Sequence, residues 1–175
     1  LLIIFSTLIL FSNANTAEYP STSIAVIDLN LILNESKAAI NANEQIEEIS
    51  VKINNEISQG EKSILDEQKM LIEAQSIMAP EAFEEKRISY EKSVQDFQIK
   101  SQNTLIKLDN LIATIRVKIL DEIAPILEEI AEEKGITVVL EKGTVILNAD
   151  NMDITNIVIK QLNKNLPKIK VEFEE

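Results

Sequence analysis

The chain of 175 residues has 29 acidic and 17 basic residues, a net charge of −12, and is poor in glycine (3 residues) and aromatic residues (4%). Cys, His and Trp are absent, which removes thiol and imidazole nucleophiles, histidine bases and nearly all zinc and copper sites. Abundant Ile, Leu, Glu, Lys, Asn and Gln are typical of long helices and coiled coils. The composition argues against an enzyme, and the negative charge argues against nucleic acid as a partner.

The first 17 residues are expected to be a signal peptide. Residues 1–11, LLIIFSTLILF, are apolar but too few to span a bilayer, and small and polar residues follow them. Cleavage is expected after Ala14 or after Ala17; the alternative is an uncleaved membrane anchor. Because an initiator Met and a basic start are lacking, we expect the first few residues of the precursor to be missing. The mature protein should be exported, without stable membrane insertion.

The next segment, SIAVID at residues 23–28, is apolar and β-branched and predicts a short buried strand. Asp28 is expected to cap a helix that starts at Leu29. Gly60 lies within the continuing helix at a cost of about 1 kcal/mol relative to Ala, so we expect a weak point there. The apolar seam of this helix comprises Ile46, Ile49, Ile53, Ile57, Ile64, Leu71 and Met78.

The sequence SIMAPEAFEEKR predicts a turn near residues 79–80. Pro80 cannot continue a helix but fits the first turn of a new one, and it disfavours a helical Ala79. Acidic residues follow, where the dipole of a new helix favours negative charge. The prediction is a helical hairpin over residues 35–130; the alternative is one kinked helix.

The returning helix has its aromatic residues toward the turn and its aliphatic residues toward the base. Pro125 is expected to kink it near Asp121, and Gly135 lies just past its end. Spacings of three and four residues, with one slip after residue 101, indicate a coiled-coil seam with a stutter. That seam comprises Leu105, Leu108, Ile112, Ile115, Ile119, Ile123, Ile126 and Ile130.

The stretch ITVVLEKGTVILNA is rich in Val and Ile and predicts a β-hairpin with its turn at Gly143. Asp153 or Thr155 is expected to cap a final helix that ends before Pro167. The remaining residues, 165–175, are predicted to be a charged and loose tail.

Three short strands and one helix are too few to bury a stable core alone. We therefore expect residues 23–34 and 131–164 to form a β-rich body that assembles with copies of itself. The predicted fold is α+β and mostly α, a long antiparallel coiled-coil hairpin projecting from this oligomerisation body. The residues expected to build the body are Ile24, Val26, Val138, Val139, Leu140, Val145, Ile146 and Leu147.

Three stretches together carry a family resemblance: IAVIDLNLILNESKAA, MAPEAFEEKR, and ILEEIAEEKGITVVLEKGTVILNADNMDITNIVIKQLNK. In this order they resemble the Skp/OmpH family of periplasmic chaperones of Gram-negative bacteria. The resemblance implies a homotrimer whose helical tentacles enclose a cavity for unfolded outer-membrane β-barrel proteins, without ATP or another cofactor. The best-known members resemble basic proteins, whereas this chain is acidic, so lipopolysaccharide binding is not carried over.

The apolar residues near the turn are the candidate client-binding residues: Met70, Met78, Phe83, Tyr90 and Phe97. Thioether and aromatic side chains adapt to many partners. The three aromatic residues recur every seven positions, so packing within the hairpin is the competing interpretation. If apolar contact does not capture an acidic client, the basic stretch from Lys100 to Lys118 is the alternative contact surface.

Other sites are not supported by the sequence. Adjacent carboxylates such as Glu84 and Glu85 do not face one another on a helix, so they do not form an acid–base pair. A calcium loop at residues 150–153 fails because Met152 stands where an oxygen ligand is needed. The alternative to a chaperone is a structural coiled-coil scaffold or spacer of the bacterial envelope. The turn at residues 79–80 favours the chaperone, because a spacer gains reach from an uninterrupted coil.

Overall fold

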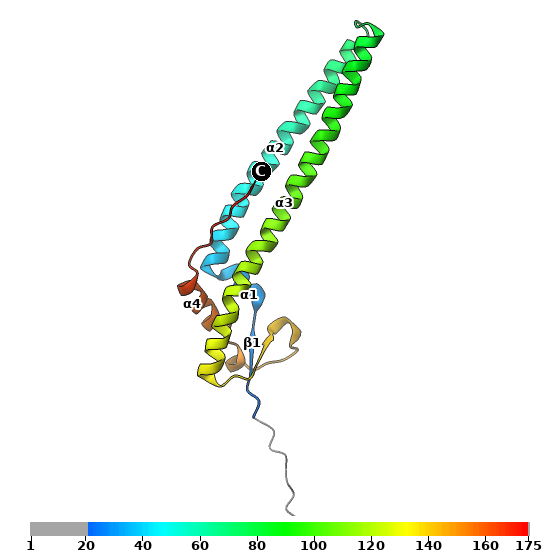
Figure 1. The fold of residues 1–175 in the computed structure, drawn as a ribbon. Coiled ribbons are helices and arrows are strands. Elements are labelled where there is room, and N and C mark those ends of the chain that lie inside the picture. Colours follow the sequence, from blue (N-terminus) through cyan, green and yellow to red (C-terminus); the bar gives the residue numbers. More distant parts are fainter. Residues whose placement is uncertain (1–20, 175) are drawn as a thin grey trace, which may run out of the picture.

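The computed structural model describes residues 21–174, in which two long helices run side by side from a small base (Figure 1). The expected α+β, mostly helical hairpin architecture is confirmed. The predicted signal peptide lies outside the described residues. Within residues 21–174 no helix combines the length and apolar character needed to cross a bilayer. The elements are β1 (Ile24–Ile27), α1 (Leu29–Glu35), α2 (Lys37–Ala74), α3 (Pro80–Lys134), β2 (Val138–Glu141), the 3-10 turns η1 (Lys142–Thr144) and η2 (Asp150–Met152), and α4 (Thr155–Asn165).

The start of the first helix was predicted correctly, but its continuity was not. The Asp28 carboxylate accepts a hydrogen bond from the Leu31 amide at 2.8 Å and caps α1. The chain then leaves the helix at Ser36, which is buried and extended (φ −67°, ψ 148°). Its hydroxyl accepts a hydrogen bond from the Ala39 amide at 3.3 Å, so Ser36 serves as the N-cap of α2. The long helix therefore starts at Lys37.

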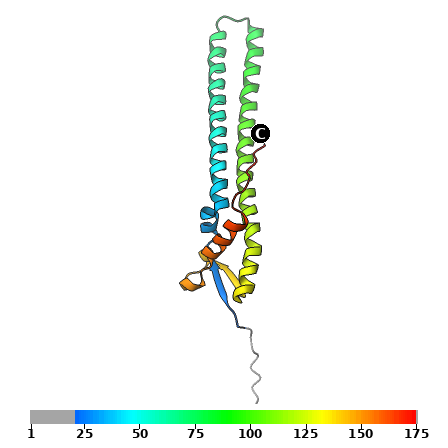
Figure 2. The ribbon, with the colours of Figure 1, turned by 90° about the vertical axis from the view of Figure 1, so that its left-hand side faces the viewer.

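The hairpin turn lies where the sequence placed it. Helix α2 ends at Ala74, Ala79 is extended (ψ 145°), and Pro80 occupies the first turn of α3. The two helices then lie antiparallel (Figure 2), which excludes a single kinked helix. Helix α3 is one element through Pro125 and ends at Gly135, whose φ of 64° is the left-handed conformation expected of a C-cap glycine.

The predicted β-hairpin at residues 136–149 is wrong. Strand β2 pairs in parallel with β1, with Ile24 opposite Val138 and Ile27 opposite Glu141. A two-residue hairpin turn needs a positive φ, whereas among the described residues only Gly135 has one, so Gly143 continues into a 3-10 turn instead. Residues 145–147 consequently form no strand.

The core at the base is completed by α3, although the residues of this helix up to Ile130 are predicted to belong to the hairpin alone. Five seam isoleucines of α3 are buried there: Ile115, Ile119, Ile123, Ile126 and Ile130. They cluster with Ala25 and Ile27 of β1, with Ile32 of α1, and with Val158 and Leu162 of α4. The strands and short helices are thus buried against the long helix of the same chain. Toward the tip the seam opens, and Leu105 is 44% exposed.

Residues 166–174 lie against the hairpin, which corrects the prediction of a loose tail for this part of residues 165–175. After α4 the chain runs back along the hairpin in an extended conformation (Figures 1 and 2). Asn41 and Gln45 of α2 hydrogen-bond to the backbone of Ile169 and Val171. We call the extended residues 166–174 the C-terminal strap.

One carboxylate connects the separate pieces of the base. Asp153 accepts hydrogen bonds from the Lys142 ammonium and from the amide of Thr155, the latter at 2.9 Å, and so replaces a capping side chain at the start of α4. The Thr155 hydroxyl also donates to Asp153 and accepts from the Asp28 amide at 2.9 Å. Partial burial alone would raise the pKa of Asp153, but the bonds from Lys142 and Thr155 outweigh it and lower the pKa from 3.8 to about 2.

Asp153→Asn should lower the free energy of unfolding at pH 7 by about 1–2 kcal/mol. At about 1.4 kcal/mol per pKa unit, the lowered pKa of Asp153 corresponds to a somewhat larger free energy than this. Because Lys142 is partly exposed, solvent screening reduces that free energy. Because the folded-state pKa is lowered, the contribution is complete above about pH 4 and is lost as the pH falls toward 2. Urea unfolding at fixed protein concentration should show the two proteins converging across this interval.

The matched control is Asp150→Asn, which removes an exposed carboxylate in the adjacent turn. It should leave the unfolding curve nearly unchanged at pH 7. An equal loss in both variants would mean that Asp153 acts only through general charge.

Candidate functional site

The predicted client-binding residues are spread along the outer half of the hairpin, and none is fully buried. Met70 on α2 is 51% exposed. Met78 lies half-buried in the turn, and Phe83, Tyr90 and Phe97 are half-buried along one face of α3. They form a line rather than a closed pocket.

Phe97 packs across the hairpin against Gly60 of α2. A Cβ added at Gly60 would lie 2.2 Å from Cε2 and 2.8 Å from Cδ2 of the Phe97 ring. The absence of a side chain at residue 60 therefore makes room for the ring. Phe97 therefore packs within the hairpin, which is the interpretation that competes with client binding. The glycine that the sequence marked as a weak point is a contact site.

Rows of exposed apolar residues beside the seam were missed. On α3, Ile88, Ile99, Ile106 and Val117 are each about half exposed, and their spacings of 11, 7 and 11 residues keep them on one side of the helix. On α2, Leu65 and Ile72 are 55% and 64% exposed, and Ile77 in the turn is 83% exposed. We call these seven side chains the exposed apolar rows. Their spacing was readable from the sequence, but the stronger seam pattern beside them concealed it.

Charges near the tip are paired on the surface. Arg87 donates to Glu84 at 2.6 and 2.9 Å and also bonds to Glu91. The hydrogen bond from Arg87 lowers the pKa of Glu84. All three side chains are accessible to solvent, so this arrangement adds little stability. It keeps part of the acidic tip locally balanced.

A second apolar surface lies on the base. Ile24, Val138 and Leu140 alternate onto one face of the β1–β2 pair and are 38–39% exposed. Ile146 and Leu147, which lie in the predicted second strand that does not form, are 104% and 88% exposed, and Val145 is half-buried. Of the other predicted body residues, Val26 is fully buried and Val139 packs against the core of its own chain.

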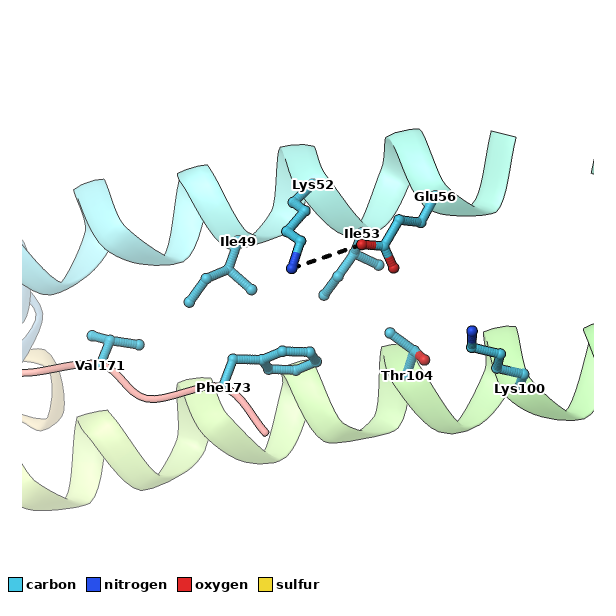
Figure 3. A pocket seen from close by; sticks show the side chains of 8 residues that line it. All are labelled: Ile49, Lys52, Ile53, Glu56, Lys100, Thr104, Val171 and Phe173. Atoms are coloured by element: carbon cyan, nitrogen blue, oxygen red, sulfur yellow. Dashed lines mark ion pairs between the residues drawn. The ribbon is translucent and has the colours of Figure 1, made fainter. Parts of the chain in front are cut away.

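Between α2 and α3, a groove of about 270 Å³ lies beside the end of the strap (Figure 3). Its walls are Ile49, Lys52, Ile53 and Glu56 of α2, Lys100 and Thr104 of α3, and Val171 and Phe173 of the strap. Half of these side chains are apolar and half are polar or charged, so the groove offers both kinds of contact. Over residues 21–174, no three His, Cys, Asp or Glu side chains are grouped as metal ligands.

A long helical hairpin with exposed apolar rows on a small packed base defines a coiled-coil binding or scaffold protein. The sequence pattern of the family described as outer membrane protein (OmpH-like) matches residues 23–162. The chain therefore belongs to the OmpH-like family. The strap lies beyond the matched residues. A comparison with curated protein sequences finds no match.

Among solved structures, the fold resembles the crystal structure of an OmpH-like protein from Caulobacter crescentus, a candidate outer membrane chaperone. The TM-score is 0.81 at 16% sequence identity, and the alignment covers 89% of this chain and 92% of that chain. At this identity the likeness concerns the fold alone.

Gly60→Ala should fail to stabilise the protein, although alanine normally gains about 1 kcal/mol over glycine within a helix. The new methyl group would collide with the Phe97 ring. In a Phe97→Ala background the same change should recover the gain of about 1 kcal/mol. Thermal or urea unfolding of the four proteins gives the coupling directly.

Ser58→Ala, at an exposed position two residues before the glycine, is the control and should have the same effect in both backgrounds. If Gly60→Ala also had equal effects in both, the contact between Phe97 and Gly60 would carry no energy.

Proposed function

We propose that this protein is an ATP-independent holdase chaperone of the bacterial periplasm that binds unfolded outer-membrane proteins and prevents their aggregation. The observation that carries the proposal is the set of exposed apolar rows along the hairpin. A helical hairpin in water gains nothing in its own fold from half-exposed isoleucines, whereas unfolded clients supply the apolar surface that would cover them. Membership in the OmpH-like family and the expected signal peptide support the location.

The proposed mechanism is weak contact at many points. Burying a half-exposed isoleucine gains roughly 1 kcal/mol, which is too little to hold a client alone. Seven such side chains on one hairpin, multiplied by the copies in an assembly, would bind an unfolded chain tightly while each contact remains exchangeable. No catalytic residue, nucleotide or metal enters this mechanism.

We further propose that the active form is a homotrimer with clients held between its hairpins. The second apolar surface, at the base, supports this. Ile146 and Leu147 have no apolar cover in the single chain, and the adjacent face of β1 and β2 is half exposed. A further copy of the base could bury both. The core within one chain is complete, so assembly would follow folding of the base and would not replace it.

The acidic charge shapes how a client is captured. This chain has a net charge of −12 and therefore repels an acidic client. At physiological ionic strength, salt screens this repulsion beyond about 8 Å. Attraction must then come from apolar contact at short range. In this mechanism apolar contact, and not attraction between opposite charges, captures the client.

Ile146→Asp with Leu147→Asp should convert the trimer to monomers, as measured by light scattering at micromolar concentration. The circular dichroism should be unchanged, because neither side chain contributes to the core of its own chain. Val139→Asp is less suitable, since Val139 packs against that core and the chain itself would be destabilised. Lys92→Ala on the exposed hairpin surface is the control and should remain trimeric. A monomeric wild-type protein would contradict the proposed assembly.

Ile72→Ser with Ile88→Ser should weaken binding of an unfolded β-barrel protein at least tenfold, because about 2 kcal/mol of apolar contact is removed. Phe83→Ser with Tyr90→Ser should also weaken it, and Gln68→Ser with Gln98→Ser, at exposed polar positions, should not. Client binding is measured by the mass of the complex in light scattering and by suppression of client aggregation.

Raising the salt concentration from low to moderate should leave the client affinity unchanged or strengthen it. An affinity that falls steeply with salt and does not respond to the apolar substitutions would instead identify the basic stretch from Lys100 to Lys118 as the contact surface. A wild-type protein that binds no unfolded client would favour a scaffold.

A further inference from the structure

The C-terminal strap has the pattern of a half-buried strand although it pairs with no strand. Ile169, Val171 and Phe173 are half-buried, and the residues between and after them are exposed. The exposed residues are Lys170, Glu172 and Glu174. This alternation of apolar and charged residues gives an extended segment one apolar face, which here lies on the hairpin.

The hairpin binds the strap through its backbone. Gln45 donates to the carbonyl of Ile169 at 2.8 Å and accepts from the amide of Val171 at 3.2 Å. Asn41 accepts from the amide of Ile169 at 3.3 Å. These side-chain amides contact peptide groups that every residue carries. They would therefore serve an extended peptide of another sequence equally well.

The groove is longer than the strap that occupies it. The 270 Å³ space beside Phe173 (Figure 3) extends past Thr104. A neighbouring space of about 120 Å³ shares Ile53 and Thr104 and reaches Gly60 and Phe97. A cavity of about 150 Å³ holds a benzene ring, so the unfilled part has room for further apolar side chains. The strap fills only the end nearest the base.

Charge complements the apolar contact at this site. The Lys107 ammonium donates to the backbone carbonyl of Glu174 at 3.4 Å. Glu172 forms an ion pair with Lys170, and Lys118 also stabilises its negative charge. The acidic end of the strap thus lies over residues 100–118 of α3, which carry four basic side chains and one acidic one.

We propose that the groove between α2 and α3 is a binding site for an extended client segment in which apolar residues alternate with acidic ones. The strap is its built-in occupant, which a client displaces. Transmembrane β-strands carry this two-residue alternation, so the site would recognise single unfolded strands. The identity of the client rests on the proposed function. The location of the site rests on the strap, which is bound there in this structure. The strap lies outside the residues 23–162 that match the family.

The test uses a fluorescent peptide with the sequence of the strap, LPKIKVEFE, and the full-length protein. In Val171→Ser with Phe173→Ser the internal strap is released while the groove stays intact. This variant should bind the peptide about tenfold more tightly than the wild type in fluorescence anisotropy. Lys168→Ser changes an exposed strap residue and is the control; it should bind as the wild type does. A peptide of the same composition without the alternation should not bind.

A gain that is absent, or equal for both peptides, would overturn the proposal. Adding Gln45→Ala to the released variant should remove most of the gain, because the backbone contacts are lost. If the released variant fails to fold, a second measurement decides. The chain has no cysteine, so Thr104→Cys with Phe173→Cys can be linked by a short bifunctional thiol reagent, which should abolish peptide binding relative to the unlinked protein. Unchanged binding after linkage would also overturn the proposal.

The outcome is separable from that of the holdase proposal. Peptide binding that responds to strap release, without protection of an unfolded barrel protein, would support the groove and contradict the holdase. Protection of clients without any response of peptide binding to strap release would support the holdase and contradict the groove.

Discussion

The row of buried isoleucines on α3, from Ile115 to Ile130, is the constraint on which the rest of the structure depends. It lies at the base of the longest helix and covers β1, α1 and α4 at once. Two strands of four residues would not be stable alone. The α3 isoleucines already supply most of a core, so the strands are stabilised by packing against them. The hydrogen-bond network of Asp153 and Thr155 then fixes the positions of the strands. The hairpin and the base are therefore one folded unit.

Outward from this row the two helices share a progressively thinner seam. Buried side chains become sparse, and isoleucines beside the seam are left half exposed. A coiled coil that served only as a strut would be expected to place polar residues there. The same thinness that costs the hairpin stability leaves apolar surface available along its length. This links the packing of the rod to the proposed capture of unfolded chains.

As proposed, the groove beneath the strap gives the hairpin a second kind of binding surface. The exposed rows offer apolar contact without backbone recognition, which suits collapsed or irregular segments. The groove adds side-chain amides that hydrogen-bond to an extended backbone, together with local positive charge in an otherwise acidic protein. Occupation by the chain's own C-terminus would keep this surface covered when no client is present, at the expense of affinity for weak clients. Apolar surface on a free chaperone invites self-association, so a built-in occupant has a physical rationale.

Features set by neighbouring residues were predictable from the sequence. The cap at Asp28, the turn before Pro80 and the left-handed Gly135 each follow from local backbone chemistry, and the isoleucine seam follows from helical periodicity. Of the candidate site, the aromatic line was found and the exposed rows were readable but overlooked. The tertiary structure decided what depends on residues distant in sequence. The run from residue 138 to 147 reads as a hairpin, yet Val138–Glu141 finds β1 more than a hundred residues away. Likewise, the alternation in the strap shows an extended segment with one apolar face, but only the folded hairpin brings Asn41, Gln45 and the groove to it. A strand's pattern specifies its faces, whereas its partner is specified by whichever edge or groove the rest of the chain leaves open.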